Sequence, residues 1–329
     1  MIPAFLRTSV ATLILLATSS ATYASADAFN LLDKMSHSFR ELNYQGVFSY
    51  QQGDDLQSLR ITHSVINGEE YERLEYMDGD QRDVVRHRHD LNCVHPGHRI
   101  VRMLSTSEFD EQSDKDPIQG EALPSKLSNY YQFSNVGTGR IAGRDVTKLL
   151  ISPKDSHRLT RRLALDDETG LLLQSVLIGP KNKVLERFQF VDITIGKKLA
   201  EAYFHEGENS HEAPHIGPAT EAPEFLTIAS RSWSVKWIPG GYTPVIENSD
   251  NGSEDIATFT DGLAVFSVFL ERSKKNSLSV EGQSQRGATI AYSKPVLLAG
   301  RPHRVTVVGE IPSQTAQLVA ESITLVPSQ

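Results

Sequence analysis

Apolar and polar side chains alternate in a long series of segments along this chain. Alternation with a period of two is typical of β-strands, because successive side chains point to opposite faces of a sheet. Turn residues such as Asn67-Gly68 and Asp78-Gly79 separate the segments. No helix-length pattern lies between consecutive segments, so the strands should pair antiparallel. The expected strands are residues 45–51, 59–66, 71–77, 83–88, 99–103, 131–136, 145–151, 158–165, 171–178 and 184–195.

A helix should precede these strands. Apolar residues recur there at steps of three and four, which places them on one stripe of a helix. They are Phe29, Leu32, Met35, Phe39 and Leu42. A second, short helix is expected over residues 123–131, where Pro124 suits the first turn. The pattern predicts a mainly β (α+β) protein: a large curved antiparallel sheet or unclosed half-barrel, with helices covering one face.

The first 26 residues have the character of a secretory signal peptide. Arg7 is the only charged residue before Asp27, and residues 10–17 form an apolar run too short to span a bilayer. Ala24-Ser25-Ala26 fits the small-residue pattern that precedes a cleavage point. The alternative is a buried N-terminal helix. We expect residues 1–26 to be removed and the mature chain to be soluble outside the cytoplasm.

Charge and cysteine content exclude several classes of protein. Lys and Arg number 33 against 41 Asp and Glu, a net charge of −8, and the expected leader carries one of the positive charges. This balance argues against nucleic acid as a partner, because phosphate binding needs a basic face. A single cysteine cannot form an intramolecular disulfide, so a buried core must hold the fold.

The composition changes sharply after the strand series. His205 to Pro223 is rich in proline, glycine and charge, as expected of a linker. We therefore predict a first domain over residues 27–203, a flexible linker over 204–224 and a smaller α+β domain over 225–329. In the small domain, Asp261-Gly262 predicts a hairpin between residues 257–260 and 263–270. Further strands at 288–292 and 304–308 and a terminal helix at 313–323 suggest a small antiparallel sheet with a packed helix.

One stretch raises the question of a metal site. Residues 82–99 contain His87, His89, Cys93 and His95, and Cys93 is the only cysteine. A three-residue hairpin loop would place all four on one face and make zinc binding conceivable. A two-residue loop, the commoner connection, would put Cys93 on the face opposite His87. Two arginines nearby also disfavour a cation, so we expect no metal here.

Motifs for catalysis do not emerge from the sequence. It contains no G-x-S-x-G, S-x-x-K or H-E-x-x-H pattern. Residues 137–142 match G-x-G-x-x-A, but a strand follows where a dinucleotide site needs a helix. We expect neither an enzyme nor a cofactor.

Two sets of apolar residues are the candidate binding sites. A curved sheet covered by helices can keep a space for an apolar ligand, and aromatic residues share strand faces where such a space would lie. The candidate lipid-binding residues are Phe48, Tyr50, Leu74, Tyr76, Phe188 and Phe190. The alternative for each is an ordinary place in a filled core.

The second set lies in the small domain and suits a protein partner. Phe266 and Phe269 should lie on opposite faces of their strand, and only one face can meet the terminal helix. Aromatic residues frequently anchor interfaces. The candidate partner-binding residues are Trp237, Tyr242, Phe259, Phe266 and Phe269. The alternative is that all five form the small domain's core, which we favour for Trp237.

Several motifs carry a resemblance to a known family. LNYQGVFSY, YMDGDQRDVV, VGTGRIAGRDV, LDDETGLLLQSVLI and LERFQF resemble the N-terminal domain of the RseB/MucB family. WSVKWIPGGYTPV, FTDGLAVFSVFLE and VTVVGEIPSQTAQLVAESI resemble its C-terminal domain. The motifs occur in the family's order and span nearly the whole mature chain.

The resemblance implies a fold and a role. The N-terminal domain of that family is similar to the lipoprotein carriers LolA and LolB. The family acts in the periplasm of Gram-negative bacteria as a negative regulator of an envelope-stress sigma factor. It binds the periplasmic part of a membrane-spanning anti-sigma factor of the RseA/MucA type and shields it from site-1 proteolysis. The resemblance also implies release by a lipid or lipopolysaccharide-like ligand.

Two questions stay open at this point. One is whether the protein is instead a lipid or lipoprotein carrier of the LolA type. A carrier does not need a second domain, so the presence of that domain favours the regulator. The other is whether several copies form a homo-oligomer.

Overall fold

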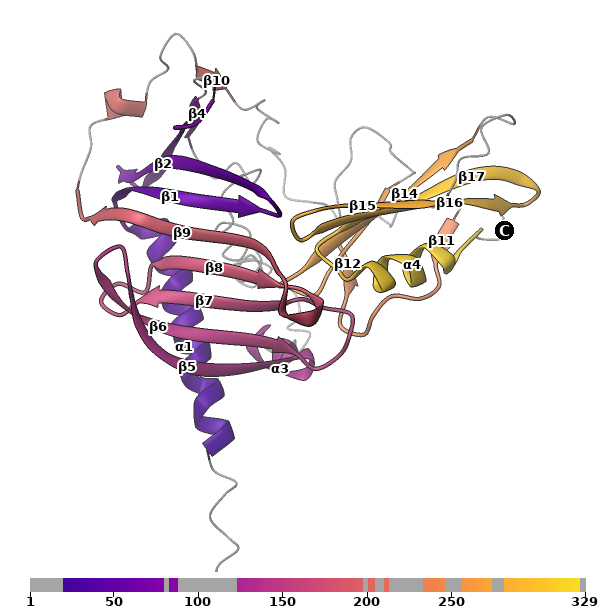
Figure 1. The fold of residues 1–329 in the computed structure, drawn as a ribbon, viewed down its shortest axis with the longest axis horizontal. Helices are drawn as coiled ribbons and strands as arrows, with labels where there is room; N and C mark the ends of the chain where they lie inside the picture. Colours follow the sequence, from indigo (N-terminus) through magenta and orange to yellow (C-terminus); the bar gives the residue numbers. More distant parts are fainter. Residues whose placement is uncertain are drawn as a thin grey trace, which may run out of the picture.

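The computed structural model describes residues 20–79, 83–87, 123–197, 201–204, 210–212, 233–245, 256–273 and 281–325. Figure 1 shows a large N-terminal sheet beside a smaller C-terminal one. Among the described residues, no helix is long and apolar enough to cross a membrane.

Ten strands form the large sheet. They are β1 (Tyr44–Gln52), β2 (Asp55–Ile66), β3 (Glu69–Tyr76), β4 (Asp83–His87), β5 (Tyr131–Ile141), β6 (Arg144–Pro153), β7 (Thr160–Asp166), β8 (Leu172–Ile178), β9 (Val184–Ile195) and β10 (Ser210–Glu212). Their order is β10-β4-β3-β2-β1-β9-β8-β7-β6-β5, so the sheet ends in two edge strands and is not closed. All pairings but one are antiparallel. The predicted unclosed half-barrel is confirmed.

Helix α1 (Ser20–Glu41) crosses one face of this sheet (Figure 1). Leu32, Met35 and Phe39 on its predicted stripe are 3 %, 0 % and 1 % exposed. They form one core with inward residues of the sheet. α1 begins upstream of the expected cleavage position, and the leader and the domain boundaries stay predictions. The second expected helix is α3 (Leu123–Tyr130).

The small sheet contains β12 (Thr243–Pro244), β13 (Ile256–Thr260), β14 (Val265–Arg272), β15 (Gly282–Arg286), β16 (Thr289–Leu298) and β17 (Arg301–Gly309). Its order is β12-β13-β14-β17-β16-β15, and every pairing is antiparallel. Helix α4 (Ser313–Glu321) covers one face with Ala316, Val319 and Ala320 buried. The small antiparallel sheet with a packed helix is confirmed.

Three details differ from the sequence-based expectations. The terminal helix ends at Glu321, and Ile323 instead opens β18 (Ile323–Leu325), which pairs with β11 (Trp233–Val235). β10 lies inside the expected linker and pairs parallel with β4, so part of that segment forms an edge strand. Short 3₁₀ helices η1 (Pro180–Asn182) and η2 (Glu201–Phe204) and strands β12 and β15 are elements that the sequence did not predict. The expected strand at residues 99–103 lies outside the described residues.

Candidate functional site

The structure brings the six candidate lipid-binding residues to one face of the large sheet. Direct cross-strand partners share a face, and Leu59 of β2 lies opposite both Phe48 and Tyr76. Phe190 pairs with Phe48, and Phe188 pairs with Tyr50. All six belong to, or pack against, the core that α1 covers: Phe48, Tyr50, Leu74, Tyr76, Phe188 and Phe190.

These side chains contact one another closely. The ring centroids of Phe48 lie 4.9 Å from Phe188 and 5.9 Å from Phe190, and those of Phe188 and Phe190 are 5.2 Å apart. All three phenylalanines are at most 2 % exposed. Here they fill the interior of the half-barrel, so an acyl chain would have to move them or enter beside them. Their role in lipid binding stays a prediction.

The histidine and cysteine stretch lies mostly outside the described residues. His89, Cys93 and His95 are not described, and His87 is described only as the last residue of β4. Among the side chains that are described, no group of three or more His, Cys, Asp or Glu is placed to hold a metal ion. The expectation about metal at this stretch therefore stays a prediction.

The five candidate partner-binding residues separate into two groups. Tyr242, Phe259 and Phe266 are 4 %, 8 % and 1 % exposed and form part of the small domain's core. Ring-centroid distances from Phe266 are 5.1 Å to Tyr242 and 5.2 Å to Phe259. For these three residues the alternative interpretation holds: they are part of the core of the small domain.

The other two residues are accessible. The core position that we favoured for Trp237 is wrong, because this side chain is 36 % exposed and stands edge-on to His157 at 5.3 Å. Trp233 is the buried tryptophan instead. Phe269 is half-buried and, as alternation predicted, lies on the sheet face opposite to Phe266.

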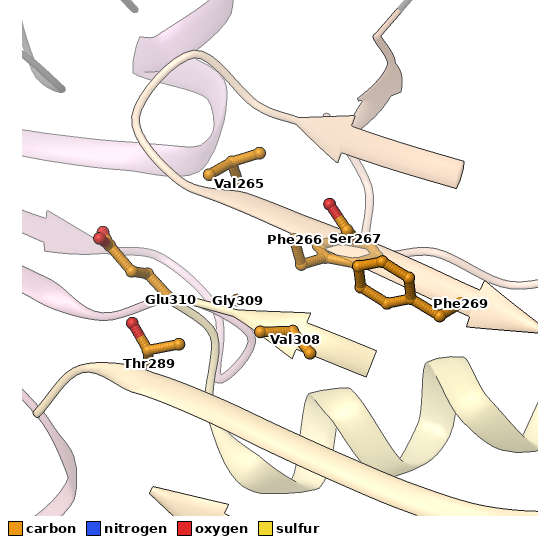
Figure 2. Close-up of a pocket in the computed structure, with 8 residues that line it drawn as sticks. All are labelled: Val265, Phe266, Ser267, Phe269, Thr289, Val308, Gly309 and Glu310. Carbon is orange, nitrogen blue, oxygen red and sulfur yellow. The ribbon is translucent and has the colours of Figure 1, made fainter. Parts of the chain in front are cut away.

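That face of the small sheet, turned away from α4, is called the outer face below. Cross-strand partners Thr258, Ser267, Val308 and Ala291 form one row across it, and Ile256, Phe269, Thr306 and Ser293 form the next. Both rows are uncharged. A pocket of about 190 Å³ opens on this face (Figure 2). Its lining is Val265, Phe266, Ser267, Phe269, Thr289, Val308, Gly309 and Glu310.

The pocket borders a contact between the two domains, called the joint below. In the joint, Arg158 Nε lies 2.6 Å from Asp261 Oδ2, and both side chains are fully buried. Arg161 Nη2 lies 2.8 Å from Glu310 Oε2, with side-chain exposures of 6 % and 5 %. Glu310 is also a lining residue of the pocket. The same carboxylate residue thus joins the domains and borders the candidate partner surface.

Three tyrosines surround the Arg158 guanidinium. Its central carbon lies 4.7 Å, 5.5 Å and 4.8 Å from the ring centroids of Tyr130, Tyr131 and Tyr242, a cation–π arrangement. Burial alone would lower the pKa of Arg158, but the Asp261 carboxylate outweighs it and the pKa is raised. Burial, and then the charge of Asp261, raises the pKa of Tyr131 well above its usual value. Tyr131 therefore stays protonated and donates to Asp261 Oδ2 at 2.8 Å.

Leu263 of the small domain completes the joint. It is fully buried and is part of the N-terminal core that includes Phe188 and Phe190. Asp261 Oδ1 accepts hydrogen bonds from the backbone N–H groups of Leu263 and Ala264 at 2.9 Å and 2.8 Å, which fixes this turn. Arg161 Nη2 donates to the Leu263 carbonyl at 2.8 Å. Leu263 thus closes part of the half-barrel interior.

A second turn of the small domain enters the large one nearby. Ala288 is buried in a cluster with Leu159, Leu177 and Leu185. Its backbone N–H donates to Glu186 Oε1 at 2.9 Å, and the other oxygen of Glu186 accepts from Tyr50. A candidate lipid-binding residue is therefore linked through Glu186 to the small domain.

Sequence reasoning missed the joint. Its ion pairs join residues separated by 103 and 149 positions, so no local pattern connects them. One signal was available: Arg161 has the same strand parity as Leu163 and Leu165, so alternation places it on the apolar face. Asp261 was taken only as a turn residue, which it also is.

Both domains match known family models. The family model for the MucB/RseB N-terminal domain matches residues 27–207, more than half of the chain. The model for the MucB/RseB C-terminal domain matches residues 227–324. The chain belongs to the MucB/RseB family. It is 34 % identical over 305 residues to the sigma factor AlgU regulatory protein MucB of Pseudomonas aeruginosa, covering 91 % of each protein.

Other members of the family extend the match. The sigma-E factor regulatory protein RseB of Haemophilus influenzae is 26 % identical over 97 % of this chain and 98 % of its own length. Among solved structures, MucB in complex with MucA(peri) is 31 % identical, with a TM-score of 0.70. That match covers 92 % of this chain and 100 % of the MucB chain. A crystal structure of MucB gives a TM-score of 0.59 over 92 % of this chain and 98 % of its own.

Proposed function

We propose that this MucB/RseB family member is a periplasmic regulator that binds the periplasmic part of a membrane-spanning anti-sigma factor and does no catalysis. The observation that carries the proposal is the match, over 92 % of this chain, to a MucB structure solved in complex with MucA(peri). The match includes both domains, and the joint buries ion pairs between them. By this binding the protein would shield the anti-sigma factor from site-1 proteolysis and keep the sigma factor inactive.

The outer face of the small sheet supports this role as the partner surface. Interface centres are depleted of charge and contain aromatic anchors. The two rows that cross this face are uncharged, and half-buried Phe269 borders the pocket. An extended apolar segment of the anti-sigma factor would place one side chain in the pocket beside Phe269. Trp237 is a second accessible anchor at the edge of the joint.

The joint supports a way in which lipid could release the partner. Leu263 occupies part of the same interior as the candidate lipid-binding residues. An acyl chain that enters this interior would compete with Leu263 and so loosen the contact between the domains. Because Glu310 belongs to both the joint and the pocket, the partner surface would change with it. The carrier alternative has no need of such a contact.

Calorimetry with a synthetic periplasmic segment of the anti-sigma factor tests the binding. Phe269→Ser should weaken binding about tenfold or more, because a buried aromatic anchor commonly contributes 2 kcal/mol or more. The matched control is Val136→Ser, which alters a side chain 46 % exposed on the large sheet. Equal affinity of Phe269→Ser and the wild type would exclude the outer face. No binding by the wild-type protein would contradict the proposed function itself.

A fluorescent fatty acid tests the release mechanism. Leu263→Ala should bind the probe more tightly than the wild type, because the acyl chain no longer has to displace the leucine side chain. Saturating lipid should also weaken binding of the anti-sigma segment by the same factor by which the segment weakens lipid binding, since coupling is reciprocal. Unchanged segment affinity in saturating lipid would eliminate lipid release for this chain. Site-1 protease assays on the bound segment then measure the protection directly.

A further inference from the structure

The end of the β16–β17 hairpin differs from the rest of the small domain's surface. We call residues 295–304 the distal tip; they comprise the end of β16, the turn at Ala299-Gly300 and the start of β17. This end points away from the large sheet (Figure 1). Ala299 and Gly300 have φ values of 47° and 72°, which suit a tight two-residue hairpin turn. The tip is therefore a narrow, well-defined projection.

An apolar side chain stands at this tip. Leu297 is 75 % exposed, the largest exposure among the large apolar side chains that the structure describes. It pairs across the hairpin with Pro302, and Pro295 lies two residues before it on the same strand face. A single exposed leucine is common on protein surfaces and by itself signals nothing. The residues near Leu297 therefore determine what its exposure signifies.

Basic side chains lie on both faces of the hairpin: Arg304 on the face of Leu297, and Arg301 and Arg272 on the opposite face. Arg301 pairs with Leu298, and Arg304 pairs with Pro295 and with Glu271 of β14. Arg272 of β14 pairs with His303. Within the part of the chain that is described, no carboxylate lies within ion-pair distance of Arg272, Arg301 or Arg304, although Glu271 is a register neighbour. On a chain whose net charge is −8, this is a local concentration of positive charge.

The combination of one exposed leucine with several arginines favours a membrane over a protein as the partner of the tip. Protein interfaces place aromatic residues at a centre that contains few charges. Here an aliphatic side chain is near the apex and arginines lie on both faces of the hairpin, which fits a bilayer surface. The apolar group enters the boundary between headgroups and acyl chains, and the arginines contact phosphates. Long arginine side chains can extend toward the headgroups while their stems stay among apolar groups.

We propose that the distal tip docks the protein on a membrane surface that contains anionic phospholipid. The attachment is weak and reversible, because one leucine and three arginines give far less than a permanent anchor. It holds the domain at the same surface from which a membrane-spanning partner would project. Docking through Leu297 and the three arginines does not require the anti-sigma interaction.

Vesicle co-sedimentation with the full mature chain tests the proposal. The wild type should sediment with vesicles of phosphatidylglycerol and phosphatidylethanolamine but not with phosphatidylcholine vesicles. Raising NaCl from about 0.05 M to about 0.5 M should release it, since added salt screens charges at a surface. Leu297→Asp should lower the partition coefficient by about tenfold to a hundredfold, the loss expected when a leucine is no longer buried. Each of Arg301→Gln and Arg304→Gln should lower it by about fivefold.

Matched variants keep the result interpretable. Leu56→Asp changes a leucine that is 65 % exposed in the other domain and should leave vesicle binding unchanged. Leu297→Trp should bind more tightly than the wild type, with a blue shift of the added tryptophan emission on anionic vesicles only. The proposal is wrong if the wild type does not sediment with anionic vesicles. It is also wrong if Leu297→Asp and Leu56→Asp have the same partition coefficient. Binding to lipopolysaccharide aggregates without binding to phosphatidylglycerol would also overturn it. Binding of the anti-sigma segment in the absence of vesicles is a separate measurement and tests the proposed function instead.

Discussion

The interior of the half-barrel and the joint between the domains are both buried, but they are built from different chemistry. The interior is made of rings and aliphatic side chains, with Phe48, Phe188 and Phe190 in mutual contact. The joint buries two arginines against two carboxylates. Apolar packing is non-directional and tolerates many arrangements, whereas a buried ion pair is satisfied in one geometry only. We infer that packing folds each domain, and that the buried charges, together with Leu263, fix how the two domains meet.

The largest expected effect is in the apolar interior. Phe188→Ala should destabilise the N-terminal domain by about 3–5 kcal/mol, because it removes a fully buried ring and leaves a cavity. Denaturant unfolding followed by circular dichroism measures the change. Val191→Ala, on the same strand and 64 % exposed, is the control and should cost less than about 0.5 kcal/mol. Equal losses in the two variants would mean that the interior is loosely packed.

The joint should respond differently. Asp261→Asn keeps the oxygen that holds the turn but places an amide N–H₂ against the donors Arg158 Nε and Tyr131 Oη. The fully buried Arg158 then keeps only the Asp155 carboxylate, whose side chain is 31 % exposed, as a charge partner. We expect docking of the domains to weaken by about 3 kcal/mol, with little change in the unfolding of either domain. Small-angle scattering should show an expanded chain, and calorimetry should show two separate transitions. The control is Asp55→Asn, which alters an exposed pair with Arg286 that also joins the domains and should cost less than about 1 kcal/mol.

A double substitution sharpens the distinction between charge and packing. Arg161→Met together with Glu310→Leu replaces a buried ion pair by apolar groups of similar size. Such replacements are often neutral or stabilising, so docking should stay within about 1 kcal/mol of the wild type. Glu310→Leu alone should resemble Asp261→Asn, because it leaves Arg161 unpaired. A double variant as damaged as the single one would show that the lost hydrogen bond from Arg161 to the Leu263 carbonyl dominates.

The smallest effect depends on pH and lies outside both regions, at the turn after β7. Burial alone would raise the pKa of Asp166, but hydrogen bonds from Arg144 and Thr169 outweigh it and lower the pKa. The carboxylate therefore stabilises the fold at neutral pH, and this contribution is lost as the pH falls through the folded-state pKa. The unfolding free energy of the wild type relative to Asp166→Asn should decrease on acidification. Glu168→Gln, which changes an exposed carboxylate on the same arginine, should show little such dependence.

Local patterns predicted the elements of the fold well. Alternation gave β1 to β9 and the four strands β13, β14, β16 and β17 of the small sheet, but not β10, β12 or β15. The spacing of Leu32, Met35 and Phe39 gave the buried stripe of α1. The hairpin at Asp261-Gly262 followed from its turn residues. The joint could not be predicted from local patterns, because Asp261 and Glu310 pair with residues of the other domain that are far away in sequence. The core position favoured for Trp237 was wrong for a related reason. Aromatic character predicts burial in general, but it does not predict which of two tryptophans the small core encloses.

The strand order of the large sheet has a consequence for how the chain reaches its structure. β1 to β4 and β5 to β9 are two series of neighbouring strands, each joined mostly by short connections, and only the β1–β9 pairing unites them. That pairing links Tyr44–Gln52 to Val184–Ile195, so it cannot form until about 140 further residues have been synthesised. Loop closure over such a distance is slow compared with hairpin formation. In the interval β1 presents an unpaired edge, the feature that most readily pairs with another chain. The species most prone to aggregation is therefore the chain in which β1 to β4 have formed but β9 has not yet paired with β1. A substitution that weakens β9 should lower the yield of folded protein.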